Sequence, residues 1–153
     1  MKLIVSLSFI IFSSSLLACP NLQGRYHHCH SEIRQMKGEY VIDQHQENDY
    51  QVYNVQYIDD ETGKSREDVI KSNSQKMSRK ETLPRVGVTV RIDASARCDA
   101  GFVTSDAEVY FLGAHVGSFV SKIYLEGKLL KSDADGSYLG RDVHKRIVCE
   151  LKE

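Results

Sequence analysis

Apolar and polar residues alternate along much of the chain after its first 18 residues. This period of two is typical of β-strands that bury one face. The clearest run lies at 86–93, where Val86, Val88, Val90 and Ile92 share one side. Shorter or weaker runs predict further strands at 38–42, 51–57, 106–111, 119–126 and 143–151.

Turn-forming residues separate these runs at short intervals. Clusters of Asp, Gly and Ser predict reversals at 59–63, 126–128 and 133–137. A short helix is expected at 67–76, and no other segment of the mature chain has helical periodicity. Many short strands with turns between them predict an all-β fold, an antiparallel meander that closes into a small barrel. A β-sandwich is the alternative.

The first 18 residues have the three parts of a secretory signal. Lys2 supplies the positive head, residues 3–12 form an apolar middle, and small residues lead to Ala18. The apolar middle is about ten residues long, well short of the roughly 20 that span a bilayer. We therefore expect a signal peptide at 1–18 and a single β-barrel domain at 19–153. The destination is then the periplasm or the medium.

Two proteases are compatible with a cut between Ala18 and Cys19. Residues 16–19 read Leu-Leu-Ala-Cys and resemble the lipobox of bacterial lipoproteins, in which Cys19 carries the lipid. The Leu at the second position and Pro20 depart from the usual form of that box. Ordinary signal-peptidase cleavage leaves Cys19 free for a disulfide and is favoured. Membrane attachment is expected only if Cys19 is lipidated.

The four cysteines predict two disulfides in an exported chain. The favoured pairing joins Cys19 to Cys29 and Cys98 to Cys149. The first pair closes a short loop, and the second joins cysteines on the apolar faces of two predicted strands. Buried free thiols are the alternative, and metal ligation is disfavoured because no C-x-x-C spacing is present.

Charge excludes one class of function. The chain has 20 Lys and Arg against 21 Asp and Glu, a net charge of −1. The two signs are interspersed, whereas a nucleic-acid groove needs a basic stripe. We therefore expect no nucleic-acid partner.

The start of the mature chain resembles two groups of proteins. Residues 19–29 follow the pattern C-P-x-L-x-G-x-Y-x-x-C, which is similar to the opening of small uncharacterised bacterial exported proteins. Gly24-Arg25-Tyr26 resembles the G-x-W opening of lipocalins and related calycin barrels, with Tyr in place of Trp. The lipocalin resemblance implies an up-and-down barrel with Tyr26 closing one end and small apolar molecules bound inside.

The run Tyr26-His27-His28-Cys29-His30 is the most unusual stretch of the sequence. On a regular strand Tyr26, His28 and His30 share one face and Cys29 lies on the other. If Tyr26 points inward, His28 and His30 line the interior. Two imidazoles with this spacing can also bind zinc or copper when a third ligand arrives from another strand. The sequence identifies no third ligand, so neither a metal nor any other cofactor is expected.

The remaining signals favour binding over catalysis. No G-x-S-x-G elbow is present, and residues 133–137 lack the spacing of a calcium loop. Tyr53 and Tyr57 share a face with Val55 and, with Tyr26, His28 and His30, are the candidate ligand contacts. The leading hypothesis is a non-enzymatic exported protein that binds a small, partly apolar ligand. The alternatives are a protein-interaction or inhibitor scaffold that presents loops, an envelope lipoprotein, and a metal-dependent enzyme using His28 and His30.

Overall fold

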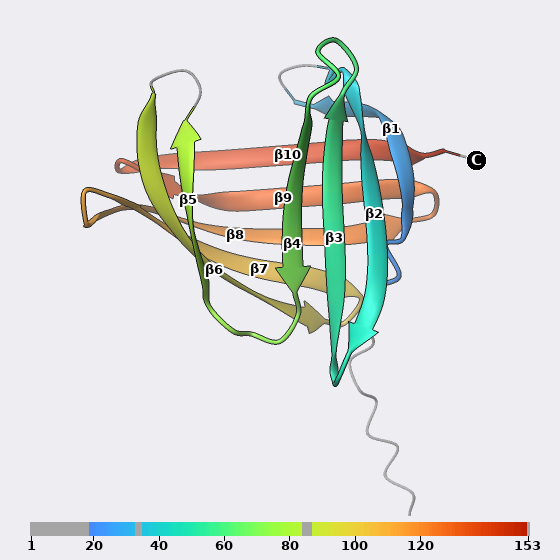
Figure 1. Ribbon diagram of the computed structural model, residues 1–153, viewed down its shortest axis with the longest axis horizontal. Coiled ribbons are helices and arrows are strands. Elements are labelled where there is room, and N and C mark those ends of the chain that lie inside the picture. The colour runs from blue at the N-terminus through green and yellow to red at the C-terminus, as the bar shows by residue number, and fades with distance from the viewer. Residues whose placement is uncertain (1–18, 33–34, 84–86, 153) are drawn as a thin grey trace, which may run out of the picture.

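The computed structural model describes residues 19–32, 35–83 and 87–152, and the expected signal peptide lies outside them. The described residues form one antiparallel sheet (Figure 1). In these ranges no helix is long and apolar enough to cross a membrane. The strands are β1 Gly24–Ser31, β2 Gly38–Glu47, β3 Tyr50–Asp59, β4 Ser65–Lys71, β5 Met77–Leu83, β6 Val88–Asp99, β7 Phe102–Phe111, β8 Ala114–Glu126, β9 Leu129–Tyr138 and β10 Arg141–Leu151.

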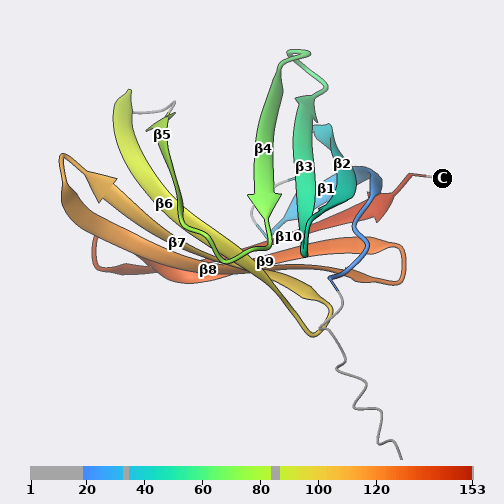
Figure 2. The same cartoon turned by 60° about the horizontal axis from the view of Figure 1, so that its bottom comes forward.

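The strand order places the first and last strands side by side in the middle of the sheet. The order is β4-β3-β2-β1-β10-β9-β8-β7-β6-β5, so that β1 pairs with β10 and every other pair is a hairpin. The sheet curls so that β2, β3 and β4 run across β8, β9 and β10 (Figures 1 and 2). One sheet thereby supplies both walls of the core.

The predicted all-β meander is therefore confirmed, as a curled half-barrel. Its edges are β4 and β5, which are consecutive in the chain but are not neighbours in the hydrogen-bonded sheet. The segment between them is anchored to β6, because Asn73 bridges to Arg97 and the Ser74 amide donates to the Ala96 carbonyl at 2.8 Å.

Two local predictions are wrong. The helix expected at 67–76 is absent: residues 67–71 belong to strand β4 and 72–76 form the segment after it, because pairing with β3 overrides a polar and weakly patterned sequence. The turn expected at 133–137 lies inside β9. Gly136 serves close packing there, since a Cβ at this position would lie 2.1 Å from the Ser118 carbonyl oxygen. The turns at 59–63 and 126–128 are present.

The core lies inside the curl and draws on most strands. Tyr26 is fully buried, and its hydroxyl donates to the Leu22 carbonyl at 2.8 Å. A buried tyrosine needs such a partner for its polar end. The other buried members of this core cluster are Leu22, Cys29, Ile42, Tyr53, Ala96, Val103, Leu130 and Cys149.

A β-bulge in β1 makes the predicted faces of the run Tyr26 to His30 wrong. His27 pairs with Glu150 and His30 with Val148, so His28 and Cys29 together lie opposite the single residue Cys149. The extra residue reverses the alternation. Cys29 is therefore buried with Tyr26, whereas His28 and His30 are exposed, contrary to the prediction that both line the interior.

The four cysteines form two disulfides, but the predicted pairing is wrong. Cys29 bonds Cys149, and Cys19 bonds Cys98. The neighbouring positions of β1 and β10 bring Cys29 opposite Cys149, and the apolar faces of the strands alone do not reveal which strands are neighbours. Two disulfides are consistent with an oxidising compartment outside the cytoplasm.

Candidate functional site

A cavity of about 180 Å³ lies between the crossed halves of the sheet. Strands β2, β3 and β4 form one wall, and β7 to β10 form the other. Apolar or aromatic side chains and the Cys149 disulfide dominate the lining, and Asp68 and Ser132 are the polar exceptions. The lining residues are Leu22, Tyr40, Ile42, Tyr53, Val55, Asp68, Ile70, Val103, Ile123, Leu130, Ser132, Ile147 and Cys149.

The cavity exists because the side chains of the two walls do not fill all the space between the crossed halves of the sheet. Positions along β3 and β4 that face inward, such as Val55 and Ile70, approach Ile123 and Ile147 of the other wall, as the lining shows. Aliphatic side chains of this size leave a gap whose only polar neighbours among the described lining residues are Asp68 and Ser132. Largely apolar cavities take apolar molecules.

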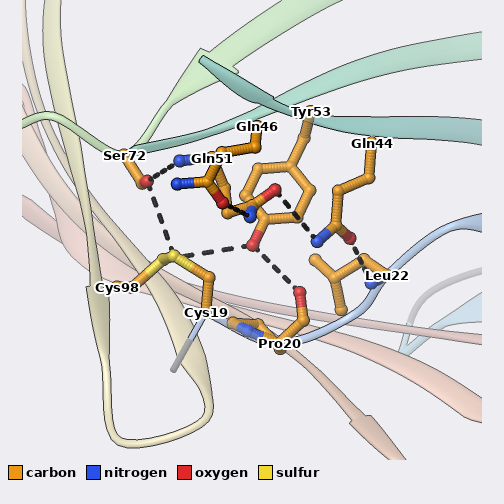
Figure 3. The surroundings of a disulfide bond; sticks show 9 residues. All are labelled: Cys19, Pro20, Leu22, Gln44, Gln46, Gln51, Tyr53, Ser72 and Cys98. Atoms are coloured by element: carbon orange, nitrogen blue, oxygen red, sulfur yellow. Dashed lines mark hydrogen bonds between the residues drawn. A yellow bond between two sulfur atoms is a disulfide. The ribbon is translucent and has the colours of Figure 1, made fainter. Parts of the chain in front are cut away.

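The segment that precedes β1 contributes Leu22 to the cavity lining, and Figure 3 shows how the segment is attached to β2, β3 and Cys98. Leu22 is 2% exposed and lines the cavity. The segment is attached by the disulfide from Cys19 to Cys98, by a hydrogen bond from the Leu22 amide to Gln44 Oε1 at 2.8 Å, and by one from the Tyr53 hydroxyl to the Pro20 carbonyl at 2.9 Å. Leu22, close to the expected cleavage site, is therefore part of the cavity wall.

Polar side chains extend this attachment into β2 and β3. The Gln51 amide donates to Ser72 Oγ at 2.9 Å, and the Gln44 side chain donates to Gln51 Oε1 at 3.3 Å. Ser72 Oγ lies 3.6 Å from the Cys19 sulfur. Each of these groups has a partner, so the polar rim beside the disulfide carries little cost of burial.

Tyr53 connects the cavity wall to this rim. Its ring lines the cavity and is 1% exposed, and its hydroxyl reaches the Pro20 carbonyl. Burial raises the pKa of Tyr53 to about 12, because the interior disfavours a phenolate. Burial also raises the pKa of Tyr40 on the same wall. The cavity thus keeps its tyrosines neutral.

The gap between the edge strands is crossed by ion pairs. Arg66 of β4 contacts Glu81 of β5, and Arg79 of β5 contacts Asp68 of β4. The Asp68 side chain is 40% exposed and also lines the cavity, so the cavity reaches toward solvent at this point. The two arginines and two carboxylates of these pairs balance in charge. Exposed pairs of this kind contribute little to stability and can part without breaking a β-ladder.

The structure brings together only part of the predicted ligand-binding set. Tyr53 lines the cavity. Tyr26 is sealed in the adjacent core, and Tyr57 packs on Tyr40 with ring centroids 5.0 Å apart, its hydroxyl donating to the Lys37 carbonyl at 3.2 Å. His28 and His30 are on the outer surface because of the bulge.

Sequence reasoning missed the aliphatic lining. Ile42, Ile123 and Ile147 each occupy an inward position of a strand, but inward positions that pack and inward positions that border a gap have the same alternation. Asp68 was missed too, because it lies in a segment that was expected to be helical and not to form a wall of the barrel. The curl of the sheet alone decides which inward residues pack and which border the cavity.

Replacing Tyr53 with phenylalanine tests the raised pKa. The neutral phenol is favoured in the folded state, so this stabilisation is present below pH 10 and is lost as the pH rises through about 12. We expect the free energy of unfolding, measured by urea titration, to fall less steeply between pH 10 and 12 in Tyr53→Phe than in the wild type. Equal slopes in the two proteins would contradict the assignment.

Comparison of the chain with protein-family models, curated protein sequences and solved structures finds no match.

Proposed function

We propose that this chain is an exported, non-enzymatic binding protein that holds one small, largely apolar molecule in the cavity between its crossed half-sheets. The observation that carries this proposal is the apolar lining of a cavity of about 180 Å³. An apolar cavity of about 150 Å³ is large enough to bind benzene, whereas drug-sized ligands need roughly 300 Å³ or more. The expected ligand is therefore a single aromatic ring system or a short alkyl chain.

Asp68 and Ser132 give the ligand a polar end. They are the polar groups among the described lining residues, and both can accept a hydrogen bond. Asp68 is already paired with Arg79, so a neutral hydroxyl or N–H suits it better than a second charge. A ring with one neutral donor, such as a phenol or an indole, combines both requirements.

The lining supports binding without chemistry. Among the described residues that border the cavity there is no histidine, and its one cysteine is in a disulfide. The carboxylate of Asp68 is held by an arginine. The Ser132 hydroxyl therefore has no histidine among the described lining residues to act as its general base.

The features that favour export support the same proposal. The signal-like segment 1–18 and two disulfides favour the periplasm or the medium. The Cys19 sulfur lies in the disulfide with Cys98, and a lipoprotein needs that atom for its thioether to lipid. We therefore favour the soluble form, with the lipoprotein as the alternative.

Indole is the probe that tests ligand binding, with uracil as a polar molecule of related shape. Because a ligand that binds only the folded state stabilises it by mass action, we expect indole to raise the melting temperature of the purified protein in a saturable manner. Uracil is expected to leave it unchanged. The absence of a shift with indole at millimolar concentration, or equal shifts with both compounds, would count against the cavity as a binding site.

A second candidate function is contact with another protein through loops. Leu112 is 90% exposed and Leu139 66% exposed, and both occupy hairpin turns with φ values of 49° and 51°. A β-strand pairing of Gly117 with Tyr138 places the two turns at the same end of the sheet, on the left in Figure 1. Large apolar side chains in strained, exposed turns favour a role in contact.

A further inference from the structure

A cluster of metal-ligating side chains lies on the outer surface, away from the cavity lining. It consists of His27 and His28 on β1 and Glu150 on β10, and the ligand atoms of all three lie within 4.8 Å of one another. His28 Nδ1 is 3.2 Å from Glu150 Oε2, and the two imidazole ring centroids are 4.0 Å apart.

The β1 bulge creates this cluster. His27 lies directly opposite Glu150 in the ladder, where cross-strand side chains are neighbours. The extra residue, His28, has a φ of 49°, and its side chain is directed outward instead of inward. Two consecutive imidazoles therefore share the surface with one carboxylate, which a regular strand does not allow.

The backbone at His28 also points to a use for its side chain. A non-glycine residue in the left-handed region is uncommon, and glycine takes this bulge position without strain. Bulges often re-aim a side chain next to a functional site. In this bulge the re-aimed side chain is an imidazole, and it faces a carboxylate.

Two imidazole nitrogens and one carboxylate oxygen are a ligand set that suits zinc. Ligands about 2.0 Å from a tetrahedral ion lie roughly 3.3 Å from one another. The 3.2 Å between His28 Nδ1 and Glu150 Oε2 already matches this separation. These two side chains are 64% and 58% exposed, so small rotations can bring the three ligand atoms around one ion, with water in the remaining position.

We propose that His27, His28 and Glu150 form a binding site for a divalent first-row transition metal ion, with Zn²⁺ as the representative. Calcium and magnesium prefer oxygen ligands and are disfavoured by the two imidazoles. The site differs from the His28 and His30 pair that the sequence suggested, because His30 follows the bulge and is outside the cluster. The ion would join β1 to β10 on the face opposite the Cys29–Cys149 disulfide.

Calorimetric titration of untagged, full-length mature protein with ZnCl₂ tests the site. We expect one equivalent of Zn²⁺ to bind the wild type, and its dissociation constant to rise at least tenfold in His28→Asn and in Glu150→Gln. Asparagine accepts the left-handed backbone, so the first variant removes the imidazole without adding strain. Glutamine keeps the size of the second side chain and removes its charge.

His30→Asn is the matched control, because it removes an exposed imidazole from the same strand outside the cluster. We expect it to bind Zn²⁺ as the wild type does. The proposal is overturned if the wild type does not bind Zn²⁺, if either cluster variant binds with the affinity of the wild type, or if His30→Asn weakens binding as much as His28→Asn. Circular dichroism of each variant checks that the fold is retained.

Discussion

Replacing both Cys29 and Cys149 with alanine is expected to lower the free energy of unfolding by about 2 to 5 kcal/mol, the range for loss of a native disulfide from a small secreted domain. The two cysteines are 120 residues apart in sequence, so their bond strongly restricts the unfolded chain. Both are buried, and Cys149 borders the cavity, so the double substitution also removes packed sulfur atoms from the core. Urea unfolding monitored by circular dichroism gives the value.

The second disulfide provides the control for this prediction. Cys19 and Cys98 are 79 residues apart and only partly buried. Loop length enters the chain-entropy cost only as a logarithm, so the two bonds differ little in that respect. We expect Cys19→Ala/Cys98→Ala to cost less, and the difference to report the packing around Cys29. Equal losses in the two double variants would contradict a core role for Cys29–Cys149.

Filling the cavity is expected to abolish most ligand binding. Ile123 lines the cavity from β8, and tryptophan at this position places an additional ring in the space that the ligand would occupy. We expect Ile123→Trp to weaken indole binding at least tenfold, which corresponds to about 1.4 kcal/mol. Its free energy of unfolding is expected to fall by no more than about 1–3 kcal/mol, the usual cost of an oversized core side chain. Calorimetry and urea titration measure the two effects.

Val120 offers a matched site on the same strand. It lies three residues before Ile123, on the opposite face of β8, and is 44% exposed. Val120→Trp adds the same side chain outside the cavity and should bind indole as the wild type does. Equal loss of indole binding in both variants would show that tryptophan weakens binding by distorting β8 and not by filling the cavity.

The alternation of apolar and polar residues was enough to predict the fold class. In β6 the expected inward residue Val90 is buried, and β8 and β10 lie where strands were predicted at 119–126 and 143–151. The alternation is informative because each of these strands has one face toward the core. It failed for β4, an edge strand with polar residues on both faces, and for the segment of β9 that contains Gly136.

Which strands are neighbours could not be predicted in the same way. In an open meander the first and last strands are the edges of the sheet, whereas here β1 and β10 pair in its middle. The pairing of Cys29 with Cys149 follows from that meeting. The bulge at His28 was equally hidden, because one additional residue in a short strand leaves no mark on the pattern except a change of phase. The candidate metal site depends on both features, because the strand pairing places His27 opposite Glu150 and the bulge directs His28 outward.

The cavity was predicted in kind but not in detail. Tyr53 was identified as a candidate ligand contact, and it lines the cavity. The aliphatic residues that form most of the lining were expected only as core. The same residue types fill a core and line a cavity. Whether a gap remains between them depends on differences smaller than one side chain, and these are set by the curvature of the whole sheet.

The most direct test of the central proposal is a nuclear Overhauser measurement on protein with labelled Ile, Leu and Val methyl groups, in the presence of indole. The cavity predicts contacts from indole protons to the methyl groups of Ile42, Ile123 and Leu130. Contacts confined to the exposed Leu112 and Leu139 would place binding at the hairpin turns. That result, or the absence of any contact at saturating indole, would contradict a ligand-binding cavity.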